Sequence, residues 1–231
     1  MKKLFILVLF LASSCTTSSS DVLILSESTC ELPCWYNVVP GETTKEEYIQ
    51  YIEDIPTNGL QPSINVIDGT TLTLFDGVVT YKVESGWFLN RRLEFWIQAW
   101  WTSDNIIRYV DMCSDEDLNT TISDLINKTG EPEFIISGGN RLGGKDIILI
   151  NSLKGISYWY QTNQQIQNIE TNISPDIKIR CLEIFDTKMY GDLMEVGLFS
   201  MGFYNTEETL KVMYPWDGYG NLDEKYPPRQ P

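Results

Sequence analysis

The chain has 231 residues with 32 acidic and 17 basic side chains, and its net charge of −15 argues against binding to nucleic acid or to anionic lipid through charge. It contains no histidine, which excludes Ser-His-Asp and Cys-His catalysis as well as histidine-ligated metal sites. We expect neither a cofactor nor a metal. The length suffices for one large domain or for two small lobes with a hydrophobic core.

The first 14 residues have the pattern of a secretory signal peptide. Two lysines precede an apolar run from Leu4 to Leu11, which is too short to span a bilayer, and small residues lead to Cys15. The segment resembles a bacterial lipoprotein signal, which implies an acyl anchor such as palmitate on Cys15 and a polar tether over residues 15–21. The alternative is cleavage after Ser14, which would leave a secreted protein without an anchor.

The number of cysteines favours the lipid anchor. If Cys15 carries lipid, then Cys30, Cys34, Cys113 and Cys181 form an even set, as expected in an oxidising compartment. Four cysteines allow three pairings. We favour Cys30–Cys34 together with Cys113–Cys181, because the last two each sit in a strand-like run.

Residues 22–114 predict an N-terminal lobe with one helix and an antiparallel sheet. Residues 22–25 indicate a short edge strand, and a helix is expected from Thr43 or Thr44 to the residue before Pro56. Alternation over 72–83, interrupted by Asp76-Gly77, predicts a hairpin. Two further strands are predicted over 93–101 and 106–113.

Residues 115–231 predict a C-terminal lobe built on a similar plan. Thr120 or Thr121 begins a helix that ends at Gly130-Glu131-Pro132. Strands are predicted over 133–137, 146–151, 156–162 and 176–186, and an aromatic tail is expected to pack on the sheet. The likeness between the halves is compatible with an internal duplication or with chance, and the two lobes are compatible with one domain.

Trp96 and Trp100 fall on one face of the strand predicted over 93–101, opposite Phe95, Ile97 and Ala99. At about 3.3 Å per residue, the two indoles lie about 13 Å apart. Exposed indoles at this spacing would form a platform for sugar rings. The alternative is that a helix or the tail covers them.

Three segments resemble an uncharacterised family of bacterial envelope lipoproteins: the CELPCW and Pro-Gly-x-Thr-Thr stretch over 30–44, the T-x-x-D-L-I-x-x-x-G-E-P pattern over 121–132, and W-D-G-Y-G over 216–220. The resemblance implies an envelope location and an α+β build, and no catalytic residues. A helix entered at Gly-x-Thr and left at Gly-x-Pro before antiparallel strands is also similar to outer-membrane-assembly lipoproteins of the BamE/SmpA type, which bind other proteins.

The sequence therefore predicts an α+β fold, with one or two antiparallel sheets and a few short helices. The expected function is that of a non-catalytic lipoprotein that binds an envelope protein or supports envelope assembly. A carbohydrate-binding or glycan-cleaving surface protein is the alternative. No pair of carboxylates stands out as catalytic in the sequence, so the chain is not expected to be an enzyme.

Overall fold

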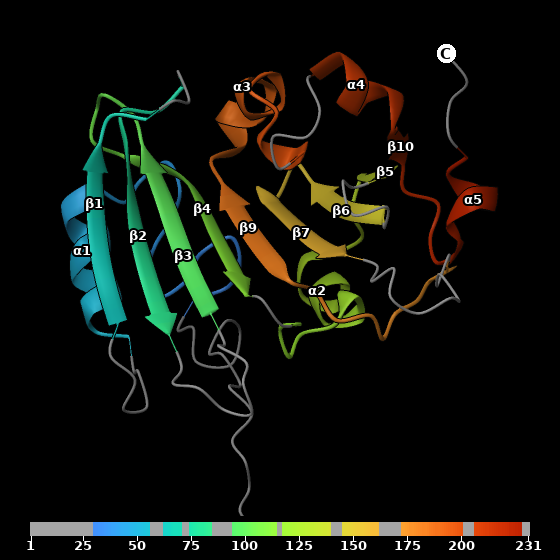
Figure 1. Ribbon diagram of the computed structural model, residues 1–231, viewed down its shortest axis with the longest axis horizontal. Helices are drawn as coiled ribbons and strands as arrows, with labels where there is room; N and C mark the ends of the chain where they lie inside the picture. Colours follow the sequence, from blue (N-terminus) through green and yellow to red (C-terminus); the bar gives the residue numbers. More distant parts are fainter. Residues whose placement is uncertain are drawn as a thin grey trace, which may run out of the picture.

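The protein has an α+β fold organised around one large antiparallel sheet, as the sequence predicts (Figure 1). This computed structural model describes residues 30–55, 62–70, 74–84, 94–114, 117–139, 145–161, 172–200 and 206–227. Cys15, the signal segment and the strand expected over 22–25 lie outside these residues.

The first half of the sheet follows helix α1 (Lys45–Glu53), and the second half follows helix α2 (Ile122–Thr129). The first half contains β1 (Pro62–Asp68), β2 (Gly77–Glu84), β3 (Glu94–Trp101) and β4 (Ile107–Ser114). The second half contains β5 (Phe134–Gly139), β6 (Lys145–Asn151), β7 (Ile156–Gln161) and β9 (Cys181–Phe185), and the tail adds β10 (Met213–Pro215).

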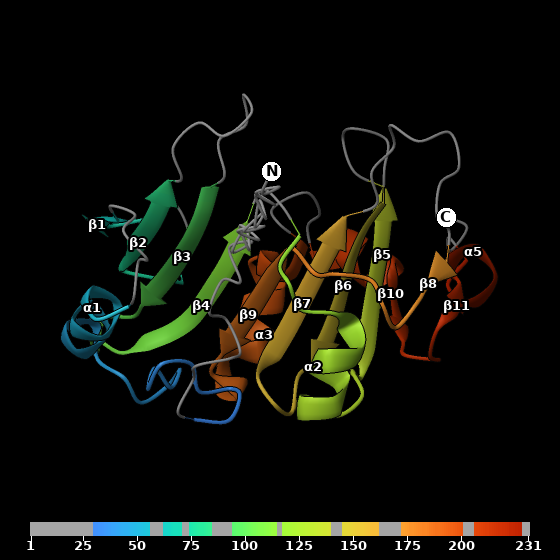
Figure 2. The same cartoon turned by 90° about the horizontal axis from the view of Figure 1, so that it is seen from below.

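The nine strands run in the order β1-β2-β3-β4-β9-β7-β6-β5-β10, which Figure 2 shows from one side of the molecule to the other. Strands β4 and β9 pair antiparallel at the junction of the two halves. The boundary expected between residues 114 and 115 therefore falls within one continuous sheet. A separate two-stranded sheet joins β8 (Asn172–Ile173) to β11 (Gly220–Asn221).

Hydrophobic side chains are buried on both faces of the sheet. On one face, Tyr48 and Ile52 of α1 and Leu125 of α2 join a core that extends across the central strands. On the other face, α3 (Tyr190–Glu195) and η2 (Leu198–Ser200) cover a smaller core around Phe185 and Phe199. The remaining helices are η1 (Thr187–Met189), α4 (Thr206–Lys211) and α5 (Leu222–Lys225).

Helices α1 and α2 begin with the same capping arrangement. The side chain of Thr44 accepts a hydrogen bond from the backbone N–H of Glu47, whose carboxylate accepts one from the backbone N–H of Thr44. Thr121 and Asp124 form the same reciprocal pair at the start of α2. Each arrangement satisfies two N–H groups at the helix start that have no partner within the helix.

Equivalent backbone hydrogen bonds tie each helix start to residues at or just before the start of β4 in the first half and of β9 in the second half. The N–H of Ile107 donates to Thr43 O at 2.8 Å, and the N–H of Ile179 donates to Thr120 O at 3.0 Å. Two further bonds of the first half have counterparts in the second half. Gly41 N donates to Ile107 O as Leu118 N donates to Ile179 O. Lys45 N donates to Asn105 O as Ile122 N donates to Ile177 O. The two halves therefore share one structural plan.

Loss of a cap is expected to destabilise the protein modestly. We expect Thr121→Ala to lower the free energy of unfolding by about 1 kcal/mol, because it leaves the backbone N–H of Asp124 without its side-chain acceptor. Urea unfolding followed by far-ultraviolet circular dichroism measures the loss. Thr121→Ser keeps the acceptor and serves as the control, so a loss as large as that of the alanine variant would contradict the role of the cap.

Two sequence predictions need correction, and one strand was not predicted. The hairpin predicted at Asp76-Gly77 is wrong, because β2 begins at Gly77 and pairs with β1 over 62–68. Strand β1 was not predicted, because its seven residues are all exposed and lack a clear apolar alternation. The strand predicted over 176–186 is confined to 181–185, because residues 177–179 hydrogen-bond to the start of α2.

Both favoured disulfides are present. Cys30–Cys34 closes the loop that precedes α1, and Cys113–Cys181 joins β4 to β9 with a Cα–Cα distance of 4.2 Å. Cys113 and Cys181 are paired positions in the sheet and are both buried. The longer-range disulfide therefore links the two halves across their junction.

Candidate functional site

A row of polar side chains crosses the middle of the sheet on the face opposite α1 and α2. Successive cross-strand pairs join Thr80 on β2, Gln98 on β3, Asp111 on β4, Glu183 on β9 and Ser157 on β7. Side chains at directly paired positions project from the same face and contact each other. The row is therefore continuous over five strands and passes through the junction of the two halves.

Asp111 and Glu183 meet at the centre of this row. Glu183 is 3% exposed and accepts hydrogen bonds from the hydroxyls of Ser157 and Tyr109. Asp111 keeps partial exposure, yet its Oδ1 is buried and has no hydrogen-bond partner. Its Oδ2 lies 3.7 Å from Sγ of Cys113, which is part of a disulfide and has no proton to donate.

Burial raises the pKa of both carboxyls because it disfavours their charged forms. The neighbouring charge of Glu183 raises the pKa of Asp111 further, although backbone hydrogen bonds of Asp111 and Gln98 act in the opposite direction. Burial and the two carboxylates also raise the pKa of the Tyr109 hydroxyl. Among the described residues, no lysine or arginine lowers the pKa of either carboxyl.

Arg108 on β4 and Arg180, the residue before β9, bind other acids. Arg108 pairs with Asp104 and also with the buried Asp186, at 2.7 Å from its Oδ2, and Arg180 pairs with Asp117 at 3.3 Å. Asp186 shows the usual arrangement of a buried acid, in which an arginine compensates the charge. The Asp111–Glu183 pair lacks such compensation within the described part of the chain.

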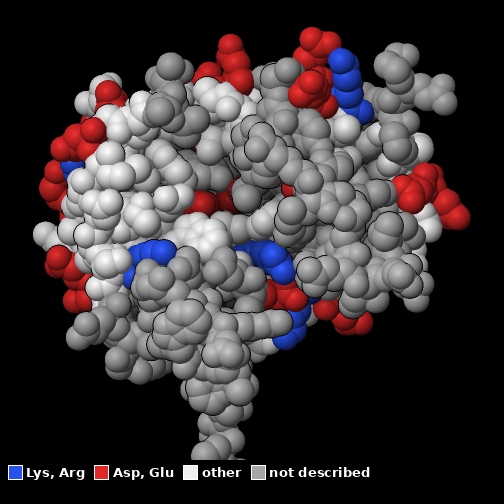
Figure 3. Space-filling view, in the orientation of Figure 1, with Lys and Arg blue, Asp and Glu red and all other residues white. Residues whose placement is uncertain are grey.

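The surface of this face is hollowed near the middle of the molecule, and acidic atoms are visible inside the hollow (Figure 3). Strand pairing places Asp111 and Glu183 at the centre of the same face. The partial exposure of Asp111 is consistent with a position on the floor of such a hollow.

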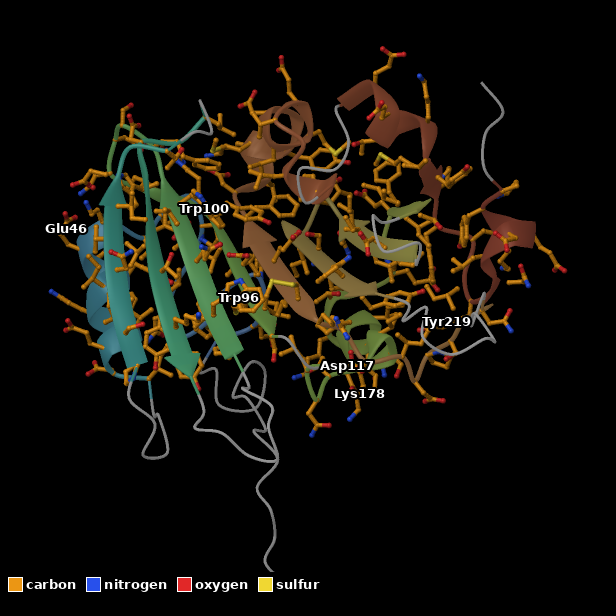
Figure 4. The ribbon with its side chains drawn as sticks, viewed as in Figure 1. Glu46, Trp96, Trp100, Asp117, Lys178 and Tyr219 are labelled. Atoms are coloured by element: carbon orange, nitrogen blue, oxygen red, sulfur yellow. A yellow bond between two sulfur atoms is a disulfide. The ribbon has the colours of Figure 1, made fainter. Side chains whose placement is uncertain are left out.

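Trp96 and Trp100 lie on either side of the polar row, along β3 (Figure 4). Both are partly buried, and both pack against the smaller core. The ring of Trp100 lies 5.1 Å from that of Tyr109 and 6.2 Å from that of Phe75, measured between centroids. Trp96 is paired with Cys113 of the disulfide.

The aromatic residues of the tail do not cover Trp96 and Trp100, because they pack on the other face of the sheet. Tyr214, Trp216, Tyr219 and Tyr226 pack against the core on the helix face, and β10 pairs with β5 at the far edge of the sheet. The sequence prediction that the tail packs on the sheet is confirmed. The two tryptophans instead share their face with polar groups.

Two residues of the site, Asp111 and Glu183, were missed by sequence reasoning. Each is a single acid within an otherwise mostly apolar strand, Tyr-Val-Asp-Met-Cys over 109–113 and Cys-Leu-Glu-Ile-Phe over 181–185. That isolated position was an available signal, because a lone carboxyl in a buried strand requires a partner or a function. Their contact required the pairing of β4 with β9, which connects residues far apart in the chain.

The tail carboxylates show no sign of a cation site. Asp217 lies 3.4 Å from Lys225, and the side chain of Asn221 caps α5. No group of three or more cysteine, aspartate or glutamate side chains in the described residues could hold a metal ion. Likewise, no helix within those ranges has the length and apolar character needed to cross a membrane.

Comparison of the chain with protein-family models, curated proteins and solved structures finds no match.

Proposed function

We propose that this chain is a lipid-anchored, non-catalytic binding protein of the bacterial cell envelope, and that another envelope protein docks on the sheet face opposite α1 and α2. The observation that carries the proposal is the polar row of that face, flanked by the partly buried Trp96 and Trp100. Protein interfaces commonly combine aromatic anchors with polar groups that define orientation. The role of this protein in envelope assembly would follow from the partner it holds.

The envelope location is supported by the sequence pattern around Cys15 and by the pairing of the other four cysteines. An acyl anchor on Cys15 would keep the folded part on the extracytoplasmic side of a membrane, with residues 16–21 as a spacer. A partner in the same compartment is then the natural ligand.

Replacement of the anchor cysteine tests the location. We expect Cys15→Ser to move the protein from the membrane fraction to the soluble fraction of the cell envelope, because serine lacks the sulfur to which the lipid would be attached. Immunoblots of both fractions measure the change. Cys30→Ser, which keeps Cys15, is the control and should stay with the membrane, whereas retention of Cys15→Ser would contradict the lipid anchor.

Crosslinking in intact envelopes followed by affinity purification tests the docking face. We expect Trp96→Ala and Thr80→Arg to reduce recovery of the partner at least about fivefold, because they remove an aromatic anchor and place a bulky charge beside Gln98. Leu153→Arg is the matched surface control, since Leu153 is 79% exposed in the turn between β6 and β7.

Recovery that is reproducible and falls only in the face variants supports the proposal. Equal recovery with all three variants would place the partner elsewhere, and no reproducible partner would contradict protein binding.

A carbohydrate ligand is the second candidate, because Trp96 and Trp100 flank two carboxyls and an amide on one face. Indole faces stack on sugar rings, and carboxyl and amide groups bind hydroxyls. A glycan array probed with the wild type and with Trp96→Ala distinguishes this candidate. A signal that the substitution removes would favour a glycan over a protein partner.

A further inference from the structure

We propose that the Asp111–Glu183 pair is the binding site for one basic side chain, preferably an arginine, of the docked protein. The inference rests on the proposed function and names the chemical group that the sheet face recognises. The hollow on this face would receive the cation between the two carboxyls and the indoles of Trp96 and Trp100.

The charge of the carboxyl pair favours a cationic ligand. Two carboxyls face each other across β4 and β9, and the described residues supply no compensating cation. Ionisation of both groups in this setting is unfavourable because of desolvation and mutual repulsion. A guanidinium or ammonium group that binds between them removes the repulsion and pairs the charges. A cationic ligand therefore gains more here than a neutral one.

Two buried polar atoms without hydrogen-bond partners also favour a ligand with donors and acceptors. Oδ1 of Asp111 is buried and accepts no hydrogen bond. Trp159 is only 8% exposed, and its Nε1 is also buried and has no acceptor. Trp159 projects from the same face, since it pairs with Cys181 and lies two residues from Ser157. An arginine side chain supplies donors for Asp111, and a peptide carbonyl beside it can accept from Trp159.

The indoles beside the carboxyl pair favour a guanidinium over an ammonium group. A guanidinium is planar, binds carboxylates through two parallel hydrogen bonds and stacks on aromatic rings, whereas an ammonium is a more strongly hydrated point charge. Trp96 and Trp100 present indole rings on both sides of the carboxyl pair. We therefore expect arginine to bind more tightly than lysine.

Binding is expected to depend on pH. Among the described side chains, the other titratable groups on this face are Tyr109 on β4, Lys82 on β2 and Asp146 on β6, and Tyr190 of α3 packs against the core of the same face. The cation favours the ionised forms of Asp111 and Glu183, so its binding displaces protons from the pair to the solvent. Affinity should therefore rise as the pH rises from about 5 to 8.

The test uses the full mature protein with Cys15→Ser and isothermal titration with small probes. The probes are N-acetyl-arginine methylamide, its lysine counterpart, free methylguanidinium, and the neutral isostere N-acetyl-citrulline methylamide. We expect the affinity to decrease in the order arginine probe, lysine probe, methylguanidinium. The citrulline probe should bind at least about tenfold more weakly than the arginine probe. Titration in buffers of different ionisation enthalpy should show proton release.

Two variants control the titration. Asp111→Asn should weaken the arginine probe at least about tenfold and reduce proton release. Glu207→Gln removes an exposed acid from α4 and should leave both unchanged. Urea unfolding of each variant confirms that it is folded at the titration temperature.

Equal binding of arginine and citrulline, unchanged affinity in Asp111→Asn, or no binding of any probe at millimolar concentration would overturn the inference. If methylguanidinium binds as tightly as the arginine probe, the ligand is a small free guanidinium-type cation and the assignment to a protein side chain is wrong. A partner that crosslinks to the face but ignores Asp111→Asn would leave the proposed function standing and refute only the cation site. Probe binding without any crosslinked partner would support the cation site and refute the proposed function.

Discussion

Replacement of both Cys113 and Cys181 by alanine is expected to lower the free energy of unfolding by about 4 kcal/mol. The two cysteines are separated by 68 residues, so the disulfide restricts a long loop in the unfolded chain. It also joins β4 to β9, the contact on which the continuity of the sheet depends. Urea unfolding under non-reducing conditions, followed by tryptophan fluorescence and circular dichroism, measures the loss.

The second disulfide provides the control for this prediction. Cys30 and Cys34 are separated by only four residues, so the same change there should cost about 2 kcal/mol. A loss for the long-range pair that is no larger than the loss for the short one would contradict the role assigned to Cys113–Cys181.

The stability of the protein is expected to fall as the pH rises above about 4, because of Asp111 and Glu183. Their raised pKa values mean that the folded state retains protons that the unfolded chain releases above its ordinary carboxyl pKa of about 4. The stabilisation is complete below that pH and is lost as the pH rises toward the folded pKa values. The slope should reach up to about 1.4 kcal/mol per pH unit for each group.

Most other shifted carboxyls act in a lower pH range and do not mask this effect. Hydrogen bonds within the caps lower the pKa values of Glu47 and Asp124, and those from Thr102, Ile106 and Arg108 lower that of Asp104. Lowered pKa values contribute stability above about pH 4 that is lost on acidification. Urea unfolding between pH 5 and 8 therefore isolates the carboxyl pair.

Asp111→Asn tests the cause of this slope. The substitution removes one buried charge, so it should flatten the decline and make the variant more stable than the wild type at pH 8. Asp186→Asn is the contrasting control, because Asp186 is buried and pairs with Arg108, and the substitution removes this ion pair and leaves the guanidinium only its more exposed partner, Asp104. It should destabilise at pH 7, and the same gain from both variants would rule out the uncompensated pair as the cause.

Local sequence chemistry was sufficient for much of the fold. A threonine followed three residues later by an acid predicted the start of each helix, because these groups cap the chain through contacts between near neighbours. Alternation predicted β3 and placed Trp96, Gln98 and Trp100 on one face. Strand β1 could not be predicted in this way, because its side chains are all exposed and show no such alternation.

The sequence by itself determined the α+β class, the capped helices and the absence of histidine chemistry, and the strand-like runs around Cys113 and Cys181 favoured the disulfide pairing that the structure shows. Only the tertiary structure decided that both halves share one sheet and that Asp111 and Glu183 meet at its centre. The physical reason is that local patterns record which face of a strand is buried, whereas the pairing of β4 with β9 at the junction of the two halves is set by packing between distant segments. The candidate site lies at such a junction, so its residues became adjacent only when β4 and β9 paired.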